Sequence, residues 1–217
     1  MNNNTQGYFV SFEGGEGAGK STQVELLSLR LKNIGCKVLS TREPGGSIGA
    51  EKIRSLLVSG HVERWDPLTE ALLHNAARLD HLNSTILPAL KDGNWVVCDR
   101  FCDSTLAYQG YGQGVDKNTL ALIQKCVVTK DPDITFVLDI PVDQGFKRLK
   151  ERFEKLSRYE KMNLEIHERL RHGFLSIAKE NSNRCKVIDA SLEPEDIHEQ
   201  IWNIMCDRFS NIITQKV

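Results

Sequence analysis

Residues 8–34 read YFVSFEGGEGAGKSTQVELLSLRLKNI, and this stretch decides the fold. Its first six residues, rich in aromatic and β-branched side chains, predict a β-strand over 8–13. A glycine-rich turn follows, and apolar residues then recur at helical spacing over 21–34, with Gly35 as the expected C-cap. A strand, a glycine turn and a helix in this order predict a loop that binds phosphate.

The glycine turn fits the pattern G-x-x-x-x-G-K-[ST] from Gly14 to Ser21. Its glycines let successive backbone N–H groups turn inward around phosphate oxygens, and the helix N-terminus adds partial positive charge. We expect Lys20 to reach the β- and γ-phosphates as a catalytic cation, and the Ser21 hydroxyl to bind Mg²⁺. The residues expected to hold ATP are Gly14, Gly15, Glu16, Gly17, Ala18, Gly19, Lys20, Ser21 and Thr22.

The rest of the chain repeats strand and helix. Further strands are predicted over 36–41, 95–99, 134–140 and 184–189, and helices over 47–59, 67–90 with a break near Pro88, 118–128, 141 to about 153, 162–179 and 194–209. Apolar strands without polar alternation are buried on both faces. The chain therefore predicts one α/β domain over 1–217, a three-layer α/β/α fold with a five-stranded parallel sheet. Ligands of such sheets bind beyond the carboxyl ends of the strands.

Composition excludes several classes. The net charge of −1 argues against a general nucleic-acid binder. The chain has no apolar run longer than four residues, so we expect no helix to span a membrane. Residues 1–7 lack the features of a signal peptide, and we therefore expect a cytoplasmic protein whose six cysteines stay reduced.

Two apolar strands end in aspartate, at Asp99 and Asp139. Either carboxylate could hold Mg²⁺ through water, as the aspartate after a strand next to a phosphate loop does. We favour Asp99, because Arg100 follows it and a guanidinium beside a metal carboxylate suits phosphoryl transfer.

A phosphate loop alone is compatible with a small-molecule kinase, a GTPase-like switch or an ATPase of a larger machine. The chain has no N-K-x-D guanine motif, which disfavours a switch. Its six histidines show no nucleophile–base motif either. A phosphate monoester acceptor would need no base, because it is already ionised near pH 7.

The stretch 147–171 carries a net charge of +4, with nine basic and five acidic residues. Arg148 and Arg152 are one helical turn apart and share a face. Because the phosphate loop has no arginine, we expect the cations that stabilise the transferring phosphoryl group to come from Arg148, Arg152 and Arg158 on a mobile flap. The alternative is a solvated basic helix face.

Four motifs together resemble the thymidylate kinase family of bacterial type, among the nucleoside monophosphate kinases with a P-loop. They are FEGGEGAGKST (12–22), TREPGG (41–46), DRF (99–101) and STLAYQG (104–110), and IDAS (188–191) also fits. The resemblance implies a doubly wound fold, usually in a homodimer. It also implies transfer of a phosphoryl group from Mg²⁺·ATP to dTMP, which gives dTDP.

The resemblance further implies the residues of the dTMP site. Arg54 and Arg100 would grip the dTMP phosphate, and Arg78 would bond a thymine carbonyl. The full set expected at dTMP is Glu16, Glu43, Arg54, His74, Arg78, Arg100, Thr105, Tyr108 and Gln109. The arginines at 148, 152 and 158 fall in the LID segment, about 148–162, and residues 188–192 would lie near adenine.

Each implied role has a plainer alternative. Arginines on amphipathic helices, such as Arg54 and Arg78, are by default solvated. His74 departs from the family pattern, which has phenylalanine there to stack on the base; an ordinary imidazole would titrate near neutral pH.

Two other hypotheses stay open at this point: a kinase of another nucleoside or nucleoside monophosphate, and a non-catalytic P-loop module driven by a partner.

Overall fold

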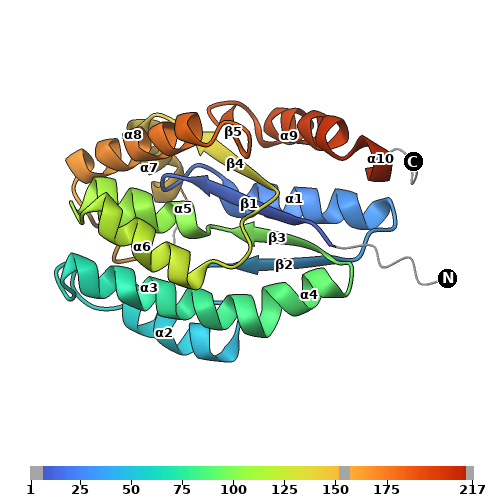
Figure 1. The fold of residues 1–217 in the computed structure, drawn as a ribbon. Helices are drawn as coiled ribbons and strands as arrows, with labels where there is room; N and C mark the ends of the chain where they lie inside the picture. Colours follow the sequence, from blue (N-terminus) through green and yellow to red (C-terminus); the bar gives the residue numbers. More distant parts are fainter. Residues whose placement is uncertain (1–6, 152–156, 214–217) are drawn as a thin grey trace.

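The computed structural model describes residues 7–151 and 157–213. Within them, five parallel strands form one sheet in the order β2-β3-β1-β4-β5 (Figure 1). The strands are β1 (Phe9–Gly14), β2 (Val38–Arg42), β3 (Trp95–Asp99), β4 (Ile134–Asp139) and β5 (Cys185–Asp189). The predicted five-stranded parallel sheet is confirmed.

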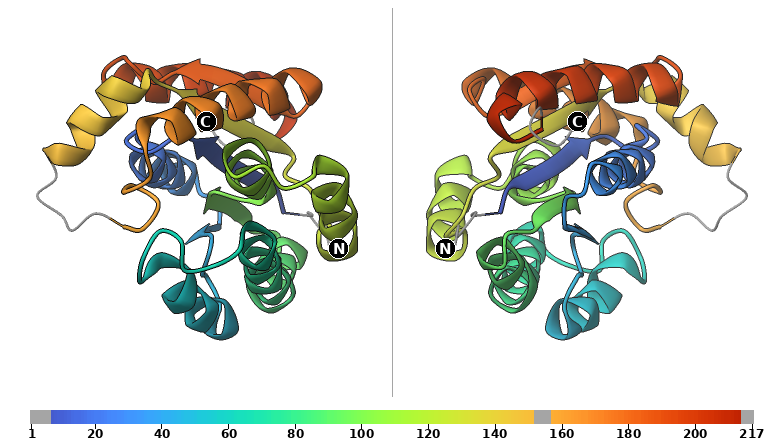
Figure 2. Two further views of the ribbon diagram at one scale, coloured as in Figure 1. Left: turned by 90° about the vertical axis from the view of Figure 1, so that its left-hand side faces the viewer. Right: turned by 90° about the vertical axis from the view of Figure 1, so that its right-hand side faces the viewer.

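Helices cover both faces of the sheet. They are α1 (Lys20–Asn33), α2 (Ile48–Val58), α3 (Pro67–His81), α4 (Leu87–Lys91), α5 (Cys102–Thr105), α6 (Lys117–Val127), α7 (Val142–Lys150), α8 (Leu164–Glu180), α9 (Pro194–Arg208) and α10 (Ser210–Ile213), with two π-helical segments, η1 (Leu82–Ile86) and η2 (Leu106–Gly112). Figure 2 shows α1 on one side of the strands and α6 on the other, and α7 standing out from the edge of the molecule.

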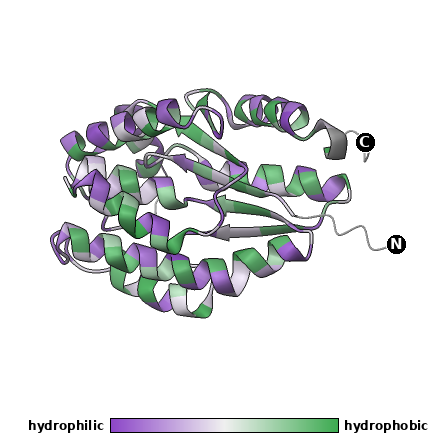
Figure 3. Cartoon of the chain, in the orientation of Figure 1, coloured by the Kyte–Doolittle hydropathy of each residue, from purple (hydrophilic) through white to green (hydrophobic). Residues whose placement is uncertain are grey.

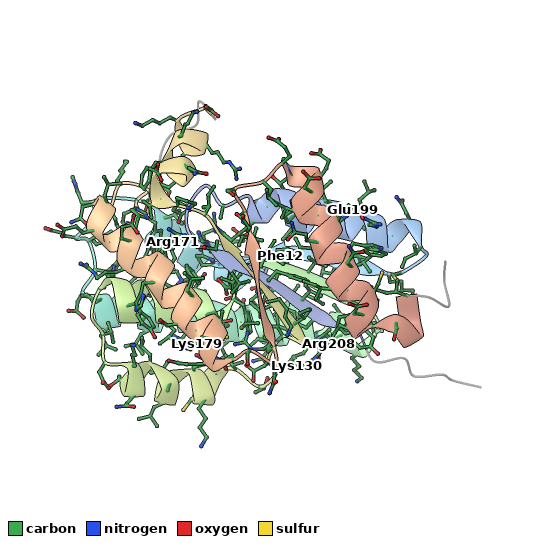
Figure 4. The ribbon with its side chains drawn as sticks, turned by 90° about the horizontal axis from the view of Figure 1, so that it is seen from above. Phe12, Lys130, Arg171, Lys179, Glu199 and Arg208 are labelled. Carbon is green, nitrogen blue, oxygen red and sulfur yellow. The ribbon has the colours of Figure 1, made fainter. Side chains whose placement is uncertain are left out.

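Alternation along the strands divides the core between the two faces. Val10 and Phe12 pack into one cluster with residues of α1 and α9, whereas Phe9 packs with Leu82 and Leu90 on the other face. Figure 3 shows the resulting pattern, with hydrophobic strands inside helices that alternate in hydropathy. Figure 4 shows Phe12 between α9, which carries Glu199 and Arg208, and α8, which carries Arg171 and Lys179. The three layers predicted from the sequence are thus present.

Side-chain caps explain where several helices begin. The Ser47 hydroxyl accepts from the backbone N–H of Ala50 before α2, and the Asp66 carboxylate accepts from the first N–H groups of α3. Asp116 and Asn163 cap α6 and α8 in the same way. These contacts satisfy N–H groups that have no partner within the helix.

The break expected near Pro88 lies earlier than predicted. Proline cannot donate a hydrogen bond to the preceding turn. The chain adapts by widening the turn before it, where the Leu87 N–H bonds the Leu82 carbonyl five residues back in η1. Pro88 itself sits in the first turn of α4, where its missing N–H costs nothing.

Two predictions from periodicity were incomplete. The segment from Cys102 to Gly112 was not expected to be helical, yet it forms α5 and η2. The helix predicted from Pro141 to about residue 153 begins instead at Val142, with Pro141 as its N-cap, and is described as far as Lys150. In the described part of the chain, no helix combines the length and the apolar character needed to cross a membrane.

A buried polar network joins the layer of α5 to the sheet. Arg184 donates to Asp103 through two bonds of 2.7 and 3.0 Å and to the Thr135 hydroxyl at 2.6 Å. The Thr135 hydroxyl in turn bonds the Ser11 hydroxyl at 2.7 Å. Asp103 is 4% exposed and the Arg184 side chain 18%, so the carboxylate is buried while its partner is half-buried.

We predict that Asp103→Ala lowers the free energy of unfolding by about 3 kcal/mol, because it leaves the Arg184 charge without its partner. Urea denaturation measures this change. Glu199→Ala, which removes an exposed partner of Arg30, should leave the midpoint nearly unchanged. Equal losses in the two variants would contradict the role given to the buried network.

Candidate active site

A cavity of about 350 Å³ lies at the carboxyl ends of the strands, where the fold predicts a site. Most of the predicted site residues line it: Glu16, Gly17, Gly19, Lys20, Ser21, Glu43, Arg54, His74, Arg78, Asp99, Arg100, Thr105, Tyr108 and Gln109. Gly14, Gly15, Ala18 and Thr22 belong to the loop and to α1 without lining this cavity. Arg148 and Arg158 do not line it, and Arg152 lies outside the described residues.

The loop between β1 and α1 has the backbone that the motif predicts. Gly14, Gly17 and Gly19 have φ angles of 134°, 71° and 84°, which L side chains rarely adopt. The Lys20 ammonium donates to the carbonyls of Gly14 and Gly15, at 3.1 and 2.6 Å. Burial, and then the charge of Arg100, lower the pKa of Lys20 to about 8. A bound phosphate would place negative charge beside the Lys20 ammonium and so favour its charged form.

The phosphate loop also touches the start of α7 directly. A Cβ added at Gly17 would lie 2.1 Å from the Gly145 carbonyl oxygen, and one added at Gly145 would lie 2.5 Å from the Glu16 carbonyl oxygen. Both positions therefore require glycine for close backbone approach. Gly145 was missed in the sequence, because a lone glycine near the start of a predicted helix gives no sign of such a contact.

The two candidate metal carboxylates differ in their surroundings. The Ser21 hydroxyl donates to Asp99 Oδ2 at 2.6 Å on the open side of the loop. Asp139 instead accepts two bonds from Arg171, at 2.7 and 3.0 Å. Asp99 and Ser21 thus offer two hard oxygen ligands beside the phosphate loop, which suits Mg²⁺. Among the described residues no cluster of three or more His, Cys, Asp or Glu could hold a metal, so water and nucleotide would complete its shell.

Arg100 occupies the centre of the cavity wall with a φ of 68°. Its guanidinium donates to the Gly14 carbonyl at 3.0 Å and to Glu16 Oε1 at 2.9 Å. Glu16 Oε1 also accepts from the Tyr108 hydroxyl at 2.6 Å. Burial alone would raise the pKa of Glu16, but Arg100 and Lys20 hold it at about 2. Glu16 is therefore a carboxylate between two cations.

Glu13 is a residue of the site that the sequence prediction did not include. Its carboxyl oxygens accept from the N–H groups of Phe101 (2.7 Å) and Ser104 (3.3 Å) and from the Ser104 hydroxyl (2.6 Å). It is fully buried. Burial, followed by the charge of Asp103, raises its pKa to about 8. The sequence signal was a carboxylate ending an apolar strand, and the structure shows that it shapes the turn that carries Arg100.

Arg78 is buried rather than solvated, which rules out the plainer alternative for this arginine. Its guanidinium donates to Glu43 at 2.7 Å, to the Thr105 hydroxyl at 3.0 Å and to the Phe101 carbonyl at 3.1 Å. Arg54 is held less tightly and donates to the Pro44 carbonyl at 2.6 Å. The two arginines face the same cavity from α3 and α2.

The segment η2 places Tyr108 and Gln109 in the wall. Gln109 is fully buried, and its amide nitrogen donates to Glu70 Oε1 at 2.8 Å. Its amide oxygen has no hydrogen-bond partner in the part of the chain that the structure describes. A buried amide oxygen without a donor is costly, so it is a suitable acceptor for a bound ligand.

His74 does not titrate near neutral pH, contrary to the expectation for an ordinary imidazole. Burial, and then the charges of Arg78 and Arg100, lower its pKa to about 3. Its Nε2 lies 2.8 Å from the Tyr159 hydroxyl. Because the imidazole is neutral, its Nε2 can accept a hydrogen bond from the Tyr159 hydroxyl while its Nδ1 carries the ring proton.

The two described arginines of the predicted LID bond to groups other than the phosphate loop. Arg148 donates to the carbonyls of Ala190, Ser191 and Leu192, at 2.8, 3.3 and 3.3 Å. Arg158 is 1% exposed and forms an ion pair with Glu70 of α3. The structure thus brings Arg148 to the segment after β5 and Arg158 to the first turn of α3.

Comparison with known proteins agrees with this geometry. The family model described as thymidylate kinase matches residues 12–201. Thymidylate kinases of Caulobacter vibrioides and Bartonella henselae are 48% identical over 205 residues and 47% identical over 207 residues; the first alignment covers 94% of this chain and 98% of the relative, the second 93% and 96%.

A solved structure is similar over the same length. The crystal structure of thymidylate kinase from Ehrlichia chaffeensis superimposes with a TM-score of 0.75 at 36% identity, and the match covers 92% of this chain and 99% of that one. Sequence, fold and cavity lead to one conclusion: the chain belongs to the thymidylate kinase family.

Proposed function

We propose that this chain transfers the γ-phosphoryl group of Mg²⁺·ATP to dTMP, which gives ADP and dTDP for dTTP synthesis. The observation that carries the proposal is one cavity that is lined both by Gly17, Gly19, Lys20 and Ser21 of the phosphate loop and by a second wall of arginines and hydrogen-bonding side chains. A donor held by the loop and an acceptor held by the second wall would meet in this cavity. Family membership supports dTMP as the acceptor.

The reaction needs positioning more than proton transfer. An oxygen of the dTMP phosphate attacks the γ-phosphorus, and the bond from that phosphorus to the β–γ bridging oxygen breaks in line, so that ADP leaves with the electron pair. The acceptor oxygen is already ionised near pH 7 and requires no base. Catalysis then depends on orientation and on neutralising charge in the transition state.

The phosphate loop would hold the donor. Its backbone N–H groups surround the phosphates, and Lys20 exchanges its two carbonyl acceptors for phosphate oxygens. Ser21 and Asp99 would hold Mg²⁺, which supplies charge neutralisation to the donor phosphates when bound. Arg148 and Arg152 stay proposed as catalytic arginines; for Arg148 this role requires that it leave the carbonyls after β5.

The opposite wall would hold dTMP. Arg54 and Arg100 can grip its phosphate, and Glu16 keeps Arg100 in place. Arg78, held by Glu43 and Thr105, would bond a thymine carbonyl. Contacts with base and sugar would be completed by His74, Tyr108 and Gln109.

We also propose that the enzyme is a homodimer in the cytoplasm, where ATP and dTMP meet. Exposed leucines lie on three neighbouring helices: Leu56 on α2, Leu68, Leu72 and Leu79 on α3, and Leu122 on α6. We call these residues the leucine face. Helix α3 packs against both α2 and α6, so the leucine face spans adjacent elements. A second copy of this chain would remove it from water.

A coupled assay of ADP release with Mg²⁺·ATP tests the activity across dTMP, dUMP, dCMP, dGMP, AMP and thymidine. We expect turnover with dTMP, less with dUMP and none with purine monophosphates or free thymidine. Turnover of a different monophosphate would mean another kinase on this scaffold. ATP binding without any turnover would favour a module driven by a partner.

We predict that Lys20→Ala lowers kcat with dTMP about 10²- to 10³-fold, the scale of one lost charge contact to a transition state. The control is Lys32→Ala, which removes an exposed lysine from the last turn of the same helix and should keep the wild-type kcat. If Lys20→Ala retains more than a tenth of the wild-type kcat, the donor site is misplaced.

His74 gives a prediction about pH. Its pKa is about 3 in the folded chain and near 6.5 when unfolded, so the unfolded state binds more protons between these values. The stability that comes from keeping His74 neutral is therefore fully present above pH 6.5, and the free energy of unfolding declines as the pH falls from 6.5 towards 3. Between pH 7.5 and 5 we expect the wild type to lose about 1–2 kcal/mol more unfolding free energy than His74→Phe.

Denaturant titrations of both proteins at the two pH values measure this difference, and other titrating groups cancel in it. Loss of the Tyr159 contact in His74→Phe also cancels, because it is the same at both pH values. A larger loss in the variant than in the wild type would reverse the sign and exclude a neutral, half-buried His74.

We predict that Leu72→Asp, at the centre of the leucine face, converts the protein to a monomer. Light scattering after size-exclusion chromatography measures the mass. Leu164→Asp is the matched control, because Leu164 is 61% exposed on α8, outside the leucine face, and this variant should stay dimeric. A wild type that is monomeric at micromolar concentration would overturn the dimer proposal.

A further inference from the structure

Arg158 lies in the segment Ser157–Glu160, which returns the chain to α8, and its surroundings are not those of a phosphate ligand. Its side chain is fully buried, forms an ion pair with Glu70 and donates to the Val62 carbonyl at 2.9 Å. A third contact, at 3.4 Å, reaches the Tyr159 hydroxyl. These bonds join three separate parts of the chain: the loop before α3, α3 itself and the returning segment.

Glu70 depends equally on its ion pair with Arg158. It lies in the first turn of α3 and is fully buried. Its other partners are the amide nitrogens of Gln109 at 2.8 Å and of Gln113 at 3.3 Å, both neutral groups. If Arg158 left for a phosphate, a carboxylate would stay buried with no cation replacing it among the described contacts. Breaking a buried pair in this way is strongly unfavourable.

The residue after Arg158, Tyr159, links this ion pair to the wall of the cavity. Tyr159 lines the cavity, and its ring meets that of Tyr108 edge to face with centroids 5.6 Å apart. Its hydroxyl bonds His74 Nε2 at 2.8 Å. Tyr159 can reach these partners only while the backbone at Arg158 stays close to α3.

We infer that Arg158 is a positioning residue whose ion pair with Glu70 anchors the segment Ser157–Glu160 to α3, so that Tyr159 closes the nucleoside side of the cavity against His74 and Tyr108. The arginine therefore acts on the acceptor side through Tyr159 and does not contact the transferring phosphoryl group. The kinetic consequences rest on the proposed function; the anchoring itself does not.

The anchor is tested first without substrate. Hydrogen exchange, followed by mass spectrometry of peptides that cover residues 157–162, is compared between wild type, Arg158→Met and Glu70→Met. We expect exchange in this segment to speed up at least tenfold in both variants. Arg64→Met is the matched control, because Arg64 is exposed in the loop before α3 and its side chain donates only to Ser59 among the described hydrogen bonds. Wild-type exchange in Arg158→Met would overturn the inference.

Kinetics then separate positioning from catalysis. We expect Arg158→Met and Glu70→Met each to raise KM for dTMP about tenfold, with kcat within threefold and KM for ATP unchanged. The effects of the two substitutions on KM for dTMP should combine to less than their product in the double variant, because both remove the Arg158–Glu70 pair. A fall in kcat of a hundredfold or more in Arg158→Met alone, with KM for dTMP unchanged, would make Arg158 a catalytic residue instead.

Two further variants keep the test decisive if Arg158→Met fails to fold. Arg158→Lys keeps a charge opposite Glu70 but cannot also donate to the Val62 carbonyl, so intermediate exchange is expected and wild-type exchange overturns the anchor. Tyr159→Phe removes only the hydroxyl and should raise KM for dTMP severalfold. An inactive wild type that still shows the exchange differences would refute the proposed function and leave the anchor standing.

Discussion

The buried carboxyl group of Glu13 holds together the edge of the sheet on which the site is built. Glu13 is the penultimate residue of β1, the central strand, and accepts two backbone N–H groups and one hydroxyl from the turn after β3 and from α5. This turn contains Arg100, which adopts a left-handed backbone that a non-glycine residue rarely occupies. The hydrogen bonds to Glu13 compensate for that conformation and place Asp99 beside Ser21 and Arg100 above the phosphate loop.

The charges around the cavity are arranged in advance of any ligand. Lys20 bonds carbonyls of its own loop, Arg100 pairs with Glu16, and Arg78 pairs with Glu43. Cations held in this way need little reorganisation when phosphates arrive, which is the condition for strong electrostatic stabilisation in a site shielded from water. Neutral His74 adds no further positive charge on the nucleoside side.

The features that the sequence predicts well are local ones. The phosphate loop follows from spacing along one stretch, and the parallel sheet follows from apolar strands that alternate with helices. Features that depend on distant partners were missed or misjudged. The pKa of His74 depends on arginines that only folding brings near, and the closeness of Gly17 and Gly145 depends on two backbones meeting. No pattern in residues 102–112 marks η2 as helical, because a π-turn has neither helical nor strand periodicity.

The contact between Gly17 and Gly145 has a mechanical consequence. With no side chain between the two backbones, there is no deformable layer to absorb movement at the joint. Helix α7 continues for five residues beyond Gly145, so its far end lies about 7.5 Å from this joint. A tilt of about eight degrees at the joint would therefore displace the far end of the helix by roughly 1 Å, by the geometry of a rigid arm of that length. An adjustment of the loop around a nucleotide would thus be passed to the end of α7 without being absorbed at the joint.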